Sequence, residues 1–213
     1  MTSAETFLAA VGTDANLVCL ETDARTIVLV EGVSDQVAVE TLASRRGLDL
    51  RAEDVTVVPM GGATNIRHFL VRFDARGAGV RLAGLCDARE EPDFRRGLEW
   101  AGLGSNLDRA GMEALGFFVC VEDLEDELIN VLGAAAVEQV IDGQGELGSF
   151  RVMQKQPAQR ARTIEQQLRR FMGTRSGRKI NYARLLVDAL DLREVPRPLD
   201  RLLTHVLDVS SRA

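Results

Sequence analysis

The apolar run TIVLV at residues 26–30 constrains the fold of this chain most, because it ends directly at Glu31 and Gly32. A short run rich in β-branched residues is typical of a buried strand. The next residues, 33–46, have the pattern of a helix that ends at Gly47. The carboxylate of Glu31 is therefore predicted to lie at the carboxyl edge of a sheet, where α/β proteins build their sites.

Three further segments have the composition of strands, and a helical stretch at about 66–73 follows the first of them. These strand segments cover residues 55–60, 80–86 and 117–121. Strands separated by helices need crossover connections, which favour a parallel sheet covered on both faces. The predicted fold class is α/β, with a mostly parallel four-stranded sheet flanked by helices.

The carboxyl-terminal part of the chain has a different pattern, because strand signals disappear after about residue 132. Glycine and proline punctuate amphipathic segments that are predicted to be helices at 134–141, 164–171, 182–190 and 199–207. We predict a helical, partly basic subdomain after the α/β domain. The expected boundaries are 1–24 for an N-terminal extension, 25–131 for the α/β domain and 132–213 for the helical subdomain.

Charge is distributed unevenly along the chain. The net charge is −6, but residues 1–150 hold 12 Lys and Arg against 26 Asp and Glu, whereas residues 151–184 hold ten basic residues against Glu165 alone. This asymmetry indicates an acidic region that holds cations and a basic region that holds phosphates. A solvated helix face, balanced by the acidic half, explains the basic segment equally well.

Composition excludes several classes of protein. No apolar run approaches the roughly 20 residues that span a bilayer, and the first residues lack the basic region of a secretory signal. The three cysteines contain no CxxC pair, so neither a disulfide framework nor a thiolate zinc site is indicated. We expect a cytoplasmic protein without a membrane partner.

Carboxylates follow three of the four predicted strands. Glu31 follows the first, Asp87 the third, and the segment EDLED at 122–126 the fourth. The ends of parallel strands lie along one edge, and convergent carboxylates are the usual protein ligands of magnesium and manganese. The alternative is that these acids cap helices or lie in solvated loops.

Four motifs together resemble a known family. The segments VEGVSD, PMGGATN, GLCDARE and VEDLEDEL occur in this order between residues 25 and 131. They resemble the Toprim domain in the version found in nucleases of the overcoming-lysogenization-defect (OLD) family. Those nucleases also carry an ABC-type ATPase, but this chain contains no Walker sequence. We therefore expect a stand-alone Toprim protein, with a separate ATPase as a possible partner and a homodimer as a further expectation by analogy.

The resemblance implies a set of metal ligands. Glu31 matches the Toprim glutamate, which serves as a metal ligand or general acid/base, and Asp35 matches the second acid of that motif. Asp87 matches the first aspartate of the family's Asp-x-Asp, and Glu125 resembles the acid that completes the site. Two Mg²⁺ or Mn²⁺ ions in such a site activate a water and stabilise the leaving oxygen of a phosphodiester.

The chain departs from the family pattern at Arg89, which replaces the second aspartate of Asp-x-Asp. Three outcomes follow as alternatives: Glu90 substitutes for that aspartate, one metal is held differently, or activity is lost. Arg89 itself has the planar fork that suits phosphate oxygens.

Basic residues near the start of SGRKINYARLL resemble a segment that assists catalysis in these nucleases. Lys179 is the best match to the assisting residue, where a cation neutralises charge that develops on the phosphate. The residues expected to contact nucleic acid are Arg89, Arg175, Arg178 and Lys179. A basic cluster that contacts only solvent or backbone phosphates is the alternative.

The loop GGATN at 61–65 precedes a helix, so its amides are candidates for holding an anion. A sharp turn with Thr64 as the helix cap is the alternative.

We expect a metal-dependent endonuclease that acts on DNA in preference to RNA. The alternatives are a non-catalytic module that binds metal or nucleic acid and works with a separate ATPase, and a nucleotidyl or phosphoryl transferase with a smaller substrate.

Overall fold

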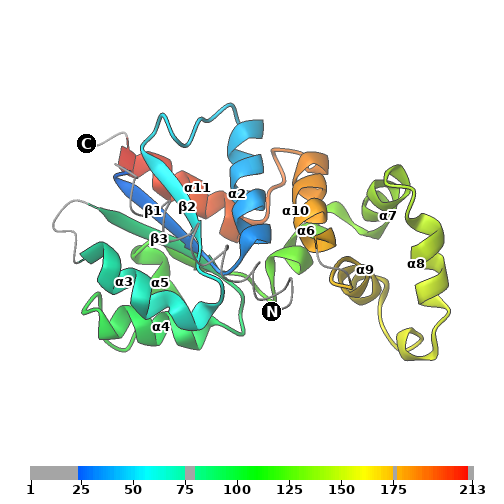
Figure 1. The fold of residues 1–213 in the computed structure, drawn as a ribbon, viewed down its shortest axis with the longest axis horizontal. Coiled ribbons are helices and arrows are strands. Elements are labelled where there is room, and N and C mark those ends of the chain that lie inside the picture. The colour runs from blue at the N-terminus through cyan, green and yellow to red at the C-terminus, as the bar shows by residue number, and fades with distance from the viewer. Residues whose placement is uncertain (1–23, 75–79, 175–176, 211–213) are drawn as a thin grey trace, which may run out of the picture.

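The computed structural model describes residues 24–74, 80–174 and 177–210. It contains one sheet of four parallel strands in the order β2-β1-β3-β4, with helices on both sides (Figure 1). The strands are β1 (Thr26–Val30), β2 (Val55–Pro59), β3 (Arg81–Cys86) and β4 (Phe117–Val119). All four lie at the predicted places, and the predicted fold class is confirmed.

Helices occupy the connections and the carboxyl-terminal part. Those between the strands are α2 (Val33–Arg45), η1 (Ala63–Asn65), α3 (Ile66–Asp74), α4 (Glu91–Trp100) and α5 (Arg109–Ala114). Those after β4 are α6 (Leu124–Leu132), α7 (Ala134–Gly143), α8 (Leu147–Gln154), η2 (Pro157–Gln159), α9 (Ile164–Met172), α10 (Arg178–Ala189) and α11 (Arg197–Ser210).

Alternating side chains of β1, one of the two inner strands, enter two separate cores. Ile27 and Leu29 pack with α3, α4 and α5 on one face of the sheet. Val28 and Val30 belong to a larger core, built with α2 and with helices from α6 to α11. Both faces of the sheet are therefore buried, as an uninterrupted apolar strand requires.

Gly84 in β3 lets the sheet pack closely. A Cβ at this position would lie 2.7 Å from the ring of Phe117 and 2.9 Å from the carbonyl oxygen of Leu29. Real Cβ atoms do not approach their neighbours this closely. The glycine is therefore a packing requirement at the centre of the sheet.

The helices after β4 divide between two locations. Helices α7, α8 and α9, here called the arm, extend away from the sheet, whereas α10 and α11 return to it (Figure 1). Arg45 of α2 donates to the carbonyl oxygens of Val187, at 2.6 Å, and Leu190, at 2.8 Å, at the end of α10. Helix α10 is thus attached to α2, the helix that follows Glu31.

The predicted division at 131/132 stays a prediction, although α10 and α11 share a core with the sheet. The predicted N-terminal extension lies outside the described residues, apart from Ala24. Within the described ranges, no helix combines the length and apolar character needed to cross a membrane.

Candidate metal centre

The backbone after β1 is held by the loop that follows β2. The amides of Gly61 and Gly62 donate to the carbonyl oxygen of Glu31, at 3.0 and 3.1 Å. Both glycines have positive φ, +71° and +127°, so glycine suits these two positions. These two amides are already bonded to protein, which does not favour an anion site here. Thr64 lies inside η1, whose N-cap is Gly62, so the expected Thr64 cap is wrong.

Asp87 comes directly after β3 and is fixed by the neighbouring strand end. The amide of Ala88 donates to the carbonyl oxygen of Glu122 at 2.9 Å. The amides of Glu90 and Glu91 donate in turn to the carbonyl oxygen of Asp87, at 3.1 and 3.2 Å. The chain therefore turns tightly after Asp87, which brings Glu90 back over the edge of the sheet.

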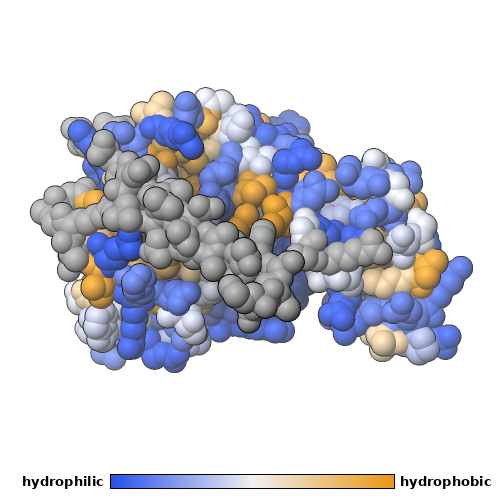
Figure 2. All heavy atoms as spheres, viewed as in Figure 1, coloured by the Kyte–Doolittle hydropathy of each residue, from blue (hydrophilic) through white to orange (hydrophobic). Residues whose placement is uncertain are grey.

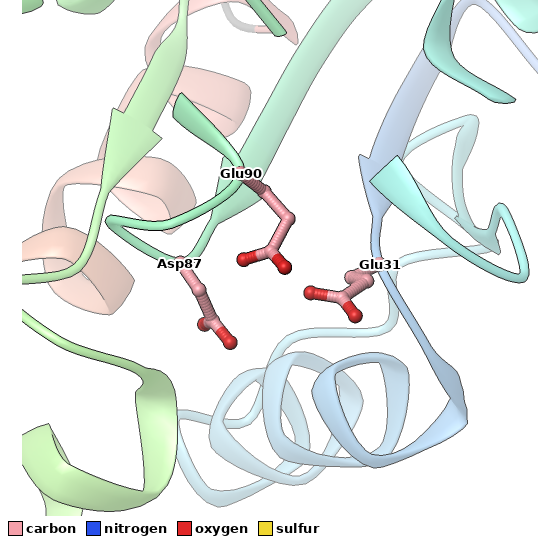
Figure 3. Close-up of side chains that lie close together, drawn as sticks. All are labelled: Glu31, Asp87 and Glu90. Atoms are coloured by element: carbon pink, nitrogen blue, oxygen red, sulfur yellow. The ribbon is translucent and has the colours of Figure 1, made fainter. Parts of the chain in front are cut away.

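Glu31, Asp87 and Glu90 form one cluster of carboxylates. Each offers an oxygen, and these oxygens lie within 4.8 Å of one another (Figure 3). All three side chains are half-buried and point into the same space. An octahedral magnesium ion with bonds of about 2.1 Å separates its ligand oxygens by about 3 to 4 Å. The three carboxylate oxygens therefore need to move only slightly closer together to coordinate such an ion.

Arg89 lies outside this cluster. Its side chain is exposed and, among the described residues, has no hydrogen-bond or ion-pair partner. Glu91 is also unavailable, because it pairs with Arg109 at 2.8 Å and with Arg95 at 3.9 Å. Of the three alternatives raised by Arg89, this geometry agrees with the first, in which Glu90 substitutes for the missing aspartate.

A second group of acids lies deeper at the same edge. Asp35, Asp123 and Glu125 are only 8%, 8% and 5% exposed. Asp35, in the first turn of α2, accepts a hydrogen bond from the amide of the N-cap residue Gly32 at 2.9 Å. Asp123 is the N-cap of α6 and accepts one from the amide of Asp126 at 2.8 Å. Glu125 lies in the first turn of α6.

Two cations from the carboxyl-terminal helices reach these buried acids. Lys179, in the first turn of α10, lies 3.3 Å from Glu125 between Nζ and Oε2. Arg169 of α9 pairs with Asp123. The partner of Lys179 was thus a predicted metal ligand, whereas sequence reasoning missed the pair between Arg169 and Asp123.

The acids at this edge raise one another's pKa values. The pKa of Asp87 is raised to about 8, first by burial and then by the charges of Asp35, Asp123, Glu31 and Glu125. Burial likewise raises the pKa of Glu125 to about 7, although Lys179 opposes the shift. The pKa values of Glu31 and Asp35 are also raised, first by burial. The ionised carboxylates therefore repel one another at this edge, and a divalent cation bound there would offset their negative charge.

Lys179 is a positively charged residue beside these acids, and they affect its pKa. Burial lowers its pKa, but Glu125 and Asp35 raise it and prevail, so the net shift is upward. The ammonium group of Lys179 is therefore charged at neutral pH beside Glu125.

The other predicted basic residues take different positions. Arg178 is 8% exposed at its side chain, pairs with Glu146 at 2.6 Å and lies over the ring of Phe171 at 4.2 Å. Its contact with nucleic acid stays a prediction, which this packing does not favour. Arg175 lies outside the described residues.

Comparison with known proteins shows the fold and gives a family match over part of the chain. Residues 24–88 match the family model described as "Overcoming lysogenization defect protein-like, TOPRIM domain". This match includes Glu31, Asp35 and Asp87 and ends before Glu125 and Lys179. A search of curated proteins found no significant match.

Solved structures of OLD proteins have the same fold. The C-terminal region of the Burkholderia pseudomallei OLD protein superposes with a TM-score of 0.63 at 19% identity, covering 88% of this chain and 98% of that one. The C-terminal region of the Xanthomonas campestris pv. campestris OLD protein gives 0.65 at 23% identity, covering 89% and 98%. The predicted resemblance is confirmed, and the family match supports a nuclease or other nucleic-acid-related function.

Proposed function

We propose that this protein hydrolyses phosphodiester bonds of nucleic acid, with DNA preferred to RNA, by using Mg²⁺ or Mn²⁺ at the acidic edge of the sheet. The observation that carries the proposal is the cluster of Glu31, Asp87 and Glu90, with Lys179 of α10 paired to Glu125 at the same edge. Two of the three cluster residues lie in the segment that matches the OLD-like Toprim family. Oxygen ligands of this kind select hard divalent cations.

The two acidic groups suggest how two ions are held. Glu31, Asp87 and Glu90 are proposed to hold one ion, and Asp35 and Glu125 a second. When bound, two such ions would polarise the phosphate and lower the pKa of the attacking water. Glu31 is proposed to orient that water, since its half-buried carboxylate points into the space shared with Asp87 and Glu90.

The remaining chemistry is assigned to cations of the chain. Lys179 is proposed to stabilise negative charge on the phosphate in the transition state, because its charged ammonium already lies at the acidic edge. Arg89 is exposed, two residues after Asp87, and is proposed to contact a neighbouring phosphate of the substrate.

The testing experiment is cleavage of supercoiled plasmid with Mn²⁺ and, separately, with Mg²⁺. Nicked or linear product is expected from the wild-type protein, and Glu31→Gln and Asp87→Asn are expected to reduce the rate at least about 100-fold. Glu194→Gln is the matched control, because Glu194 is exposed and lies outside both acidic groups. Cleavage that survives both site substitutions would refute the proposed site.

The alternative functions give different results in the same assay. A non-catalytic module binds DNA but cleaves it with neither metal, and its affinity survives both site substitutions. A transferase with a smaller substrate neither binds nor cleaves the plasmid. A separate ATPase and a second copy of the chain remain the proposed partners, and size-exclusion chromatography with light scattering tests the second.

A further inference from the structure

The basic segment at 151–184 divides into paired and unpaired residues in the structure. Five of its ten cations have acidic partners, and Arg175 lies outside the described residues. The paired ones are Arg151 with Glu138, Arg169 with Asp123, Arg178 with Glu146, Lys179 with Glu125 and Arg184 with Asp188. The other four have no acidic partner among the residues that the structure describes.

These four cations all belong to the arm. They are Lys155, Arg160, Arg162 and Arg170, here called the arm patch, and all are exposed. The first three lie in the connection between α8 and α9, and Arg170 lies on α9. Arg170 borders the same shallow hollow as Gln156 and Gln159 of that connection, which places it beside the segment that carries the other three cations. The arm is predominantly hydrophilic on the face drawn in Figure 2.

The connection that carries the arm patch is held in a defined shape. Gln167 of α9 donates to the carbonyl oxygens of Gln159, at 2.9 Å, and Arg162, at 3.1 Å, and accepts from Gln154 at 2.8 Å. Thr163 caps α9 by accepting from the amide of Gln166 at 3.3 Å. The backbone beneath the cations is therefore ordered before any ligand arrives, which reduces the entropy lost on binding.

The neighbouring hollow adds polar groups of the kind that bind a nucleic-acid backbone. Ser149, Gln156 and Thr174 border it together with Arg170. Hydroxyl and amide groups beside Arg and Lys commonly bind phosphate and sugar oxygens. A solvated helix face, in contrast, generally interleaves its cations with acids, as Arg184 and Asp188 do on α10.

We propose that the arm patch binds the phosphate backbone of the nucleic-acid substrate away from the acidic edge, so that one duplex contacts both the arm and the metal centre. This inference rests on the proposed function, because it takes its ligand to be the polymer that the acidic edge cleaves. The four cations neutralise substrate phosphates and release counterions, which makes binding strongly dependent on salt.

The test measures binding of a fluorescein-labelled DNA duplex of about 30 base pairs by fluorescence anisotropy in EDTA, as salt is raised from about 50 to about 300 mM. The variant replaces all four patch residues: Lys155→Gln, Arg160→Gln, Arg162→Gln and Arg170→Gln. We expect its affinity to fall about tenfold or more, and the slope of log K against log salt to decrease by up to about 3.6, or about 0.9 for each phosphate that is no longer neutralised. Arg51→Gln, an exposed arginine outside the arm, is the matched control and should leave both quantities unchanged.

A second measurement separates this inference from the proposed function. Bis(p-nitrophenyl) phosphate has a single phosphate and no extended backbone for the arm patch to bind, so the patch variant should hydrolyse it with Mn²⁺ at the wild-type rate. Loss of DNA affinity in the patch variant supports the inference even if neither the wild-type protein nor the variant cleaves DNA or the model substrate. Absence of all cleavage refutes the proposed function alone.

Three results would overturn the inference. These are wild-type affinity and salt slope in the patch variant, no affinity of the wild-type protein for DNA or RNA, and binding of anionic vesicles or acidic protein without binding of nucleic acid. If the fourfold variant does not fold by circular dichroism, the single variants Lys155→Gln and Arg162→Gln should each lower the slope by about 0.9.

Discussion

Lys179 Nζ lies 3.3 Å from Glu125 Oε2, which joins the first turn of α10 to the first turn of α6 at the acidic edge. The ammonium group supplies positive charge to a carboxylate that is 5% exposed and has been proposed to bind a divalent ion. Lysine and metal ion therefore compete for the same oxygens, and the proposed catalytic cation also controls how tightly the second ion binds.

Replacing Lys179 with methionine should have opposite effects on metal binding and on cleavage. Removal of the competing ammonium should tighten binding of the second Mn²⁺ about threefold to tenfold, a change of about 1 kcal/mol, as expected for an ion pair whose lysine is half-exposed to solvent. Plasmid cleavage should fall about 100-fold or more, because the group that stabilises the transition state is removed. Isothermal titration calorimetry measures the first effect, with Lys155→Met as the control; weaker binding in Lys179→Met would contradict the competition.

Glu90 and Glu91 form a natural matched pair. Glu90 shares the cluster with Glu31 and Asp87, whereas Glu91 pairs with Arg109. Glu90→Gln should weaken Mn²⁺ binding about tenfold or more, because it removes a charged ligand. Glu91→Gln should leave metal affinity unchanged and lower the free energy of unfolding by about 0.5 to 1 kcal/mol. If titration calorimetry shows that Glu91→Gln weakens Mn²⁺ binding and Glu90→Gln does not, Glu90 does not replace the aspartate missing at position 89.

Metal binding should depend steeply on pH. Without an ion, the pKa of Asp87 is about 8 and that of Glu125 is about 7, so at neutral pH Asp87 is mostly protonated and Glu125 about half protonated, and a bound cation displaces these protons. The apparent affinity for Mn²⁺ should therefore rise between about pH 6 and about pH 8 and level off above that range. Calorimetry in two buffers of different ionisation enthalpy counts the released protons; release of no protons at pH 7 would contradict the raised pKa values.

The metal-free protein should lose stability as pH rises. A carboxyl group whose pKa is higher in the folded chain binds more protons when folded, so the free energy of unfolding falls as pH increases between the two values. For Asp87 this interval runs from its ordinary value of 3.8 to about 8, and for Glu125 from 4.5 to about 7. The Tm in EDTA should therefore fall from about pH 5 to about pH 8.

Two comparisons check the origin of this pH dependence. Asp87→Asn should flatten the decline in Tm, whereas Asp142→Asn, at an exposed position on α7, should retain the wild-type slope. Saturating Mg²⁺ should also flatten it, because the ion supplies the missing positive charge. A Tm in EDTA that rises over the same interval would contradict the direction of the pKa shifts.

Gly84→Ala should destabilise the protein without affecting metal ligands directly. The added methyl group meets the ring of Phe117 and the carbonyl oxygen of Leu29, and overpacking of this kind costs about 1 to 3 kcal/mol. Gly143→Ala, at the end of α7, meets nothing within 4 Å and should be neutral or slightly stabilising. Urea unfolding measures both changes, and equal stability of the two variants would contradict the close approach.

The strands were predictable because each is a short apolar run bounded by polar or glycine residues, and each lies where expected. Helix α6 was harder to predict, because the acids of its first turn suggested metal ligands rather than the beginning of a helix. Helix α8 was also missed. Its sequence, LGSFRVMQ, begins beside glycines that suggested a loop.

The candidate site was predictable where residues share a motif and unpredictable where they meet across the fold. Glu31 and Asp87 follow strands, so parallel pairing alone brings them to one edge. No local pattern relates Arg169 to Asp123 or Arg178 to Glu146, because each pair joins helices distant in sequence. These and other ion pairs involve half of the cations at 151–184. The net charge of the segment does not show which cations are paired and which are not.

The two hydrogen bonds from Arg45 to the end of α10 limit the movement of two helices relative to each other. They fasten the helix that bears Lys179 to the helix that starts beside Glu31, so these two residues belong to one block of the molecule. The arm, which carries a separate set of cations, is joined to that block by the ion pairs of Arg169 with Asp123 and of Arg178 with Glu146. The arm patch is therefore held at a fixed position relative to the reacting groups.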